Sequence, residues 1–253
     1  MRWFLFLLLA TVSAARAQSV QLSEAQAMEI GRRIWKNECG GTVSGLTAWN
    51  SGEDFASLGI AHFIWYPEGK RGPFEESFPK LVDYLTAHGV HVPGWLAGAC
   101  PWKSRAQFMA DFQTPRMVEL RTLLKDTLGW QARFAAVRLE RALPKMLAAA
   151  PSAERPKVSD NFYRVAGEPL GLYALMDYVN FKGEGVSPTE RYRGEGWGLL
   201  QVLEAMPERG PPLPQFVKAA DHVLTRRVEN APPGRGEAKW LPGWRNRLKT
   251  YLN

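Results

Sequence analysis

The segment from Thr42 to Tyr66 breaks a pattern that runs through most of the chain. Its glycines and its small, polar and β-branched residues lack a helical period, so it is typical of a compact β-hairpin or a three-stranded sheet. Most other segments carry apolar residues at intervals of three and four, which favours helices. We therefore expect a mostly α protein of the α+β type, with one small sheet after the first helix.

The first helix is predicted to begin at a capping box formed by Ser23 and Gln26. Ile30 and Ile34 then mark its apolar face. Extending the same spacing by four residues reaches Glu38, so a carboxylate stands where the stripe predicts a core residue. This position makes Glu38 a candidate functional residue.

Further helices are indicated by the same periodicity along the rest of the chain. The stretch from 151 to 158 interrupts them and is either a domain boundary or a loop between two lobes. The predicted helices cover residues 79–88, 104–112, 114–128, 131–150, 169–185, 196–207, 214–230 and 243–252.

The N-terminus has the features of a secretory signal peptide over residues 1–17. Arg2 precedes an apolar run that is too short to span a bilayer, and Ala15-Arg16-Ala17 supplies a small-x-small cleavage pattern. The mature chain, 18–253, is then periplasmic or secreted, with no membrane anchor. Removing the two arginines lowers its formal net charge from +7 to +5. That mild excess suits an anionic polymer, and no nucleic-acid partner is expected after export.

Cys39 and Cys100 would lie in an oxidising compartment after export. They are therefore a candidate disulfide, and two buried free thiols are the alternative. His88 and His91 have no second pair of ligands at metal-site spacing, so no metal site is predicted. No phosphate loop, dinucleotide fingerprint or Gly-x-Ser-x-Gly elbow is present, and no cofactor is expected.

Two carboxyl groups in the right settings can hydrolyse a glycosidic bond. One must stay protonated to donate to the leaving oxygen, and the other must be ionised to activate water or stabilise the oxocarbenium charge. Glu38 suits the first role because an apolar helix face would desolvate it. An acidic residue of the strand-like segment that follows would supply the second.

These residues carry a resemblance to the lysozyme superfamily. Glu38, an acidic hairpin residue and the run "SLGIAHF" (57–63) resemble the phage-type lysozymes, in which a glutamate, a hairpin aspartate and Thr-x-Gly-Ile-Gly-His follow in that order. The resemblance makes Glu38 the general acid, Glu53 the hairpin carboxylate, Ser57 the residue that helps to place water, and His62 the family histidine. It implies a lysozyme-like fold, in which a bundle of helices forms two lobes around a cleft.

The same resemblance implies a glycosidase that cleaves β-1,4 bonds of an amino-sugar polymer. Peptidoglycan is the favoured substrate, which would make the protein a muramidase, and the order of motifs also resembles chitosanases of this superfamily. The sequence departs from the phage pattern because glutamate replaces aspartate at 53 and serine replaces threonine at 57. Asp54 is therefore an alternative second carboxylate.

Two other interpretations remain open. The stretch "GEGVSPTERYRGEGWGLLQ" (183–201) resembles the signature of lytic transglycosylases, with Glu184 as the single acid and base. The second interpretation is a non-catalytic envelope protein that uses a lysozyme scaffold to bind glycan or a partner protein.

Aromatic residues near the two acids favour a sugar-binding groove, because flat rings stack on pyranose faces. Trp49, Trp65 and Tyr66 flank the acidic pair. A monomer that binds a polysaccharide is expected. The predicted substrate-binding residues are His62, Trp49, Trp65, Asn180, Glu184, Arg191 and Tyr192.

Overall fold

The computed structural model describes residues 22–253, and the predicted signal peptide lies outside them. Ten α-helices and five short strands are found in this part of the chain. Short 3-10 helices cover Ser44–Leu46, Gly94–Ala97, Pro233–Arg235 and Glu237–Trp240. The strands are β1 (Thr47–Ala48), β2 (Ala56–Leu58), β3 (Phe63–Trp65), β4 (Arg191–Tyr192) and β5 (Glu195–Gly196). The α-helices are α1 (Glu24–Cys39), α2 (Phe78–Ala87), α3 (Arg105–Ala110), α4 (Pro115–Asp126), α5 (Leu128–Ala149), α6 (Arg155–Ala166), α7 (Gly171–Lys182), α8 (Leu199–Ala205), α9 (Pro212–Asn230) and α10 (Leu241–Lys249).

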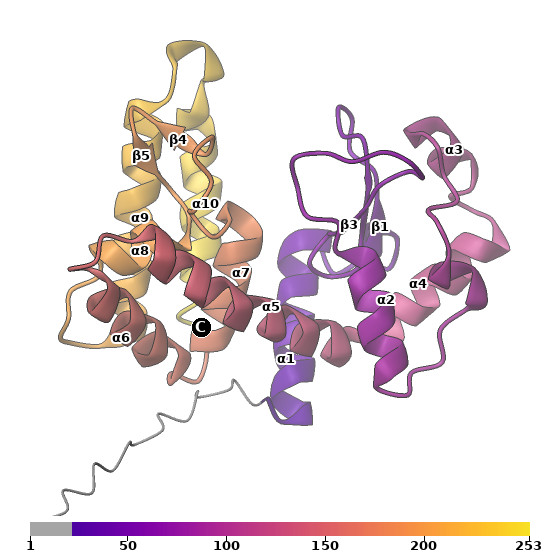
Figure 1. The fold of residues 1–253 in the computed structure, drawn as a ribbon, viewed down its shortest axis with the longest axis horizontal. Coiled ribbons are helices and arrows are strands. Elements are labelled where there is room, and N and C mark those ends of the chain that lie inside the picture. The colour runs from indigo at the N-terminus through magenta and orange to yellow at the C-terminus, as the bar shows by residue number, and fades with distance from the viewer. Residues whose placement is uncertain (1–21) are drawn as a thin grey trace, which may run out of the picture.

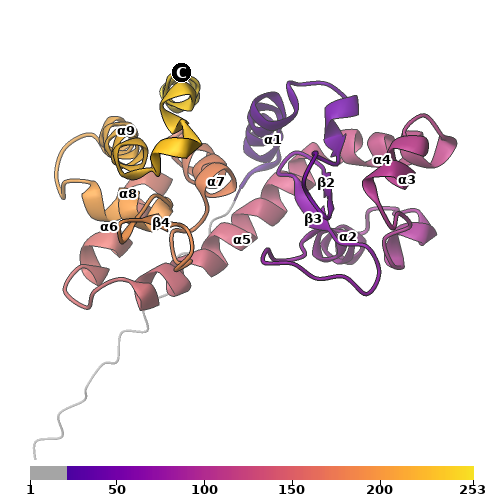
Figure 2. The same cartoon turned by 90° about the horizontal axis from the view of Figure 1, so that it is seen from above.

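The helices form two lobes joined by the long helix α5 (Figure 1). Helices α1 to α4 and the sheet β1-β2-β3 make the N-lobe, and α6 to α10 with the hairpin β4-β5 make the C-lobe. Viewed from above, α5 passes from one lobe into the other (Figure 2). The mostly α class with a small antiparallel sheet is therefore confirmed. Within the described residues, no helix has the length and apolar character needed to cross a membrane.

Of the two predicted alternatives, a hairpin or a three-stranded sheet, the segment between α1 and α2 forms the sheet. Strand β2 lies between β1 and β3, and both pairings are antiparallel. Ser57 of β2 is opposite Ala48 of β1 and Ile64 of β3. The sheet is small, most of its strand residues are buried, and β3 packs against α2.

Helix α1 begins as its sequence predicts. Ser23 accepts a hydrogen bond from the Gln26 backbone N–H at 3.2 Å, and the Gln26 side chain accepts one from Ser23 N–H at 3.0 Å. Ile30 and Ile34 are buried, and the helix packs mainly against α5. Gly40 ends α1 in the left-handed conformation, with φ of 60°.

Two elements of the C-lobe were not predicted. Helix α6 begins inside the stretch that the sequence marked as a break, because Pro156 occupies its first turn, where a missing N–H costs nothing. The hairpin β4-β5 was hidden by its brevity, since each strand contains two residues.

Candidate functional site

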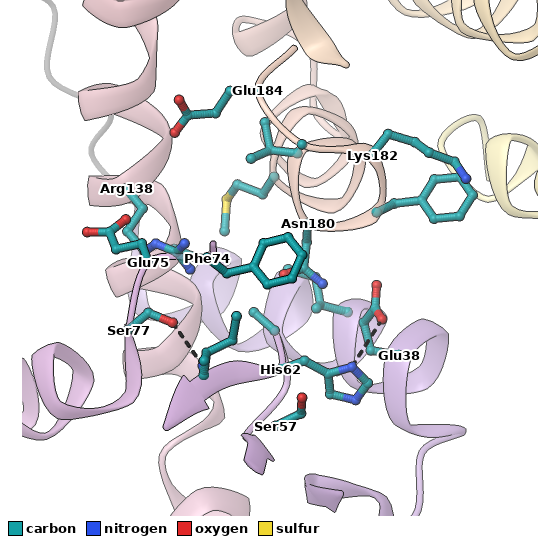
Figure 3. Close-up of a pocket in the computed structure, with 18 of the residues that line it drawn as sticks. Glu38, Ser57, His62, Phe74, Glu75, Ser77, Arg138, Asn180, Lys182 and Glu184 are labelled. Carbon is teal, nitrogen blue, oxygen red and sulfur yellow. Dashed lines mark hydrogen bonds and ion pairs between the residues drawn. The ribbon is translucent and has the colours of Figure 1, made fainter. Parts of the chain in front are cut away.

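A cavity of about 610 Å³ lies between the two lobes. Figure 3 shows Glu38, Ser57 and His62 near one end and Glu75, Arg138 and Glu184 toward the other, with the Phe74 ring between these groups. The walls come from α1, the sheet and the loop after β3 in the N-lobe, and from α7 and the segment after it in the C-lobe. Helix α5 contributes Ala135, Arg138 and Leu139.

Glu38 reaches the cavity because it continues the buried face of α1 by one turn. Its side chain is only 12% exposed. The purely apolar setting expected for Glu38 is not found, because its carboxylate accepts a hydrogen bond from Arg247 Nη2 of α10. The carboxylate Oε1 is occupied by this contact, and Oε2 faces His62.

Arg247 is held in place by Asp177 of α7. Arg247 Nε donates to Asp177 Oδ2 at 2.8 Å and Nη2 donates to Oδ1 at 2.9 Å. Asp177 is fully buried and also accepts hydrogen bonds from the Tyr251 hydroxyl at 2.6 Å and from Asn37 Nδ2 at 3.3 Å. Glu38, Arg247 and Asp177 therefore form one chain of charges that joins α1, α10 and α7.

His62 lies beside Glu38 because of a tight turn between β2 and β3. Its Nδ1 is 3.7 Å from Glu38 Oε2, and its backbone has a positive φ of 49°. Gly59 in the same turn has φ of 74°. The backbone N–H of Ile60 donates a hydrogen bond to Gln131 Oε1 at 2.9 Å. A Cβ at Gly59 would lie 2.4 Å from that oxygen, so the turn leaves no room for a larger residue at this position.

The predicted disulfide is not formed, and this expectation is corrected. Cys39 and Cys100 are buried free thiols. Cys39 Sγ lies 3.7 Å from the Gly59 carbonyl and 3.8 Å from His62 Nε2, whereas Cys100 Sγ donates to the Trp102 carbonyl at 3.5 Å. Burial and the neighbouring Glu38 charge raise the pKa of the Cys39 thiol to about 12. Burial raises the pKa of the Cys100 thiol to about 11. Cys39 is therefore a neutral thiol and a poor nucleophile, despite its histidine neighbour.

Glu53 and Ser57 both line the cavity. Glu53 accepts a hydrogen bond from Asn50 Nδ2 at 3.1 Å, and its backbone carbonyl accepts one from Trp49 Nε1 at 2.7 Å. Ser57 is buried in the central strand. Asp54, the alternative carboxylate, is exposed and is not among the lining residues.

A loop held by backbone hydrogen bonds presents Glu184 on the opposite wall. Gly183 and Gly185 on either side of it have φ of 82° and 84°. The first turn of α8 fixes this loop, because backbone N–H groups of Leu199 and Leu200 donate to the carbonyls of Gly183 and Glu184, each at 3.0 Å. The Glu184 carboxylate lies 3.3 Å from Lys145 Nζ.

The aromatic residues predicted to bind sugar are in the core instead. Trp49 packs against Phe108, and Trp65 packs between Phe78 and two other tryptophans, so neither ring lines the cavity. Tyr66 is also buried. The sequence could not separate core rings from groove rings because both lie in the same strand-like segment.

Phe74 is an aromatic wall residue that the sequence analysis missed. It lies in the loop after β3, lines the cavity and is 51% exposed. Its ring meets the ring of Phe55 edge-on, with 5.9 Å between centroids. A half-exposed ring in a cavity is free to stack on a ligand.

The remaining predicted residues of the C-lobe divide into two groups. Asn180 lines the cavity, but Arg191 and Tyr192 do not. The Tyr192 hydroxyl donates to Glu237 at 2.7 Å, and Arg191 donates to the Gly185 carbonyl at 3.4 Å. The two residues of β4 therefore contact residues outside the cavity or the backbone of its wall, and neither faces the cavity.

Lys182 at the end of α7 was not predicted. Its Nζ lies 3.6 Å from the Trp244 ring centroid and 3.9 Å from that of Phe181. Burial and the charge of Arg227 lower the pKa of Lys182 to about 7. The Lys182 amine therefore points into aromatic packing, although the residue lines the cavity.

The site thus combines carboxyl groups from both lobes in one open cavity with a half-exposed ring. This is an arrangement suited to acid and base chemistry on a polar substrate. No protein-family model, curated protein sequence or solved structure matches this chain.

Proposed function

We propose that the protein is an exported glycoside hydrolase that cleaves β-1,4 bonds of an amino-sugar polymer, with peptidoglycan as the favoured substrate. One observation carries the proposal: Glu38 from α1 and Glu53 from the sheet segment line the same cavity, together with Ser57 and His62. The mostly α fold with a small sheet after the first helix agrees with a lysozyme-like fold. Export agrees with the signal sequence predicted over residues 1–17.

In the proposed mechanism Glu38 protonates the glycosidic oxygen. The acid role requires a proton on Oε2, the oxygen that faces His62, because Arg247 donates to Oε1 and thereby orients the carboxyl group. Glu53 is the carboxylate that activates water or stabilises the oxocarbenium charge, and the Ser57 hydroxyl helps to place the water. Neither a metal nor a cofactor is part of this mechanism.

Glu184 supports a second candidate, a lytic transglycosylase. Its loop is fixed by α8 and by Gln201, whose Nε2 donates to the Gly185 carbonyl at 3.1 Å, so the carboxylate is presented to the cavity by a rigid backbone. An enzyme of this kind uses one glutamate as acid and then as base, and releases an anhydro sugar.

Digestion of purified peptidoglycan, with chitosan in parallel, tests these functions. The mature protein is compared with Glu38→Gln and Glu184→Gln, and Glu29→Gln on the exposed face of α1 is the matched control. Reducing-end muropeptides that only Glu38→Gln abolishes, as identified by mass spectrometry, are the expected result. Anhydro products lost only in Glu184→Gln would favour the transglycosylase.

The other outcomes are equally distinct. Turnover of chitosan without turnover of peptidoglycan would identify a chitosanase. Binding of either polymer without turnover would identify a non-catalytic glycan-binding protein. Full activity in Glu38→Gln would contradict the proposed mechanism.

A further inference from the structure

Arg138 projects from α5 into the cavity, at the end away from Glu38 (Figure 3). Helix α5 joins the two lobes, so this guanidinium lies between the loop after β3 on one side and the Glu184 loop on the other. Its Cζ is 5.9 Å from the ring centroid of Phe63, which covers part of the side chain. Arg138 is thus a partly buried cation on the wall of the site.

No hydrogen-bond acceptor of the described residues binds the Arg138 guanidinium. Glu75 and Glu184 flank it and act on it through their charges, but each has a lysine partner of its own. Lys80 binds Glu75, and Lys145 Nζ lies 3.3 Å from Glu184. The five N–H donors of Arg138 therefore remain available to a ligand.

The two other cations on the cavity wall are already engaged. Arg227 donates to the buried Glu237 at 2.8 and 3.1 Å. Lys182 directs its amine between two aromatic rings. Among the lining residues of the described chain, Arg138 is therefore the cation best placed to meet a ligand.

The local charges permit an anion at this end of the cavity. Arg138, Lys80 and Lys145 supply three positive charges against the two carboxylates of Glu75 and Glu184. Burial lowers the pKa of Arg138, but a guanidinium stays charged at neutral pH. Glu190 is a further carboxylate on the cavity wall: burial and the Glu184 charge raise its pKa, and the positive charge of Arg227 acts against them.

We propose that Arg138 binds a carboxylate carried by the substrate and thereby selects an acidic amino-sugar polymer over a neutral one. The planar guanidinium matches a carboxylate with two parallel hydrogen bonds, and desolvation on the cavity wall strengthens them. In peptidoglycan this carboxylate belongs either to the lactyl ether of the sugar or to the stem peptide. The inference rests on the proposed function, because it assigns a substrate class to the same cavity.

Binding to the full mature chain with Glu38→Gln tests the inference without turnover. Calorimetry is done with three ligands: a muramic acid disaccharide with a free lactyl carboxylate, the same disaccharide with its stem peptide, and an N-acetylglucosamine disaccharide. Arg138→Gln and Arg138→Lys are each added to this background. Arg133→Gln is the matched control, because it lies on the same helix, contacts Trp130 and does not line the cavity.

Arg138→Gln is expected to weaken binding of an acidic disaccharide about 10- to 100-fold and to leave the neutral one unchanged, since a hydrogen bond to a charged group is lost. Arg138→Lys should give an intermediate affinity for the acidic ligands, because lysine keeps the positive charge but cannot donate two parallel hydrogen bonds. Arg133→Gln should change neither ligand. The acidic ligand that is affected identifies the lactyl or the peptide carboxylate as the partner.

Equal weakening of acidic and neutral ligands would overturn the inference, since a structural role would have that effect. So would unchanged binding of the acidic ligands, or failure of the parent chain to bind them. The proposed function is judged separately, by turnover of polymer in the presence of Glu38. Arg138-dependent binding without turnover would keep this inference and reject the hydrolase.

Discussion

Asp177→Ala should destabilise the protein strongly, because it leaves a buried arginine without its main partner. Asp177 is 0% exposed, and Arg247 donates two hydrogen bonds to it at 2.8 and 2.9 Å. Removing one member of a buried ion pair costs about 3–5 kcal/mol. For a chain of this size, that loss lowers the melting temperature by roughly 6–20 °C, at about 2–4 °C per kcal/mol. The remaining contact to Glu38 offsets only part of the loss.

Asp221→Ala is the matched control for this prediction. Asp221 pairs with Arg245, which is on the same helix as Arg247, but the side chains are 40% and 47% exposed. An exposed pair is screened by solvent and contributes little to stability. Urea unfolding and thermal melts of both variants give the comparison. Similar losses below about 1 kcal/mol in the two variants would refute the idea that the buried network fixes α7 and α10 against α1.

Three further predictions concern the sheet turn, the thiols and the cavity wall. Gly59→Ala should lower the free energy of unfolding by about 2 kcal/mol or more, because φ is positive and a Cβ would clash with Gln131. Gly52 also has positive φ but no neighbour within 4 Å, so Gly52→Ala should cost only the backbone strain. Urea unfolding measures both changes. The pKa of Cys39 is about 12 in the folded protein and 9.0 when unfolded, so the stability that its neutral thiol contributes is complete below pH 9 and is lost as the pH rises toward 12. Cys39→Ala should therefore reduce the fall in unfolding free energy at alkaline pH. A thiol reagent at pH 8 should label the wild-type protein only after denaturation. Phe74→Ala should weaken polymer binding about 2- to 10-fold in calorimetry with less than about 1 kcal/mol change in stability, and Phe74→Tyr should restore binding.

Much of the N-lobe could be predicted because its signals are local. The capping box of Ser23, the apolar spacing that reaches Glu38 and the loss of helical period after Gly41 all lie within a few residues of the structure that they determine. Gly59 belongs to the same class, since its positive φ follows from a turn between adjacent strands. Elements with such signals begin and end close to where the sequence places them.

The charged network and the cavity wall could not be predicted because their partners are distant in sequence. Arg247 meets Glu38 across 209 residues, and no periodicity indicates which of the many arginines will do so. For the same reason the unpartnered state of Arg138 is visible only once Glu75 and Glu184 are placed beside their lysines. Trp65 shows the converse, because composition alone cannot separate a core ring from a binding ring.

Helix α5 gives the two lobes a common spine, but the lobes also have a second connection. Pro144 lies inside that helix and has no N–H, so one turn of α5 lacks the usual hydrogen bond to the carbonyl four residues earlier. The contact of Arg247 with Glu38 joins the C-lobe to α1 independently of that turn. The spacing between the carboxyl groups of the two lobes is therefore set by two separate links and is preset when substrate arrives.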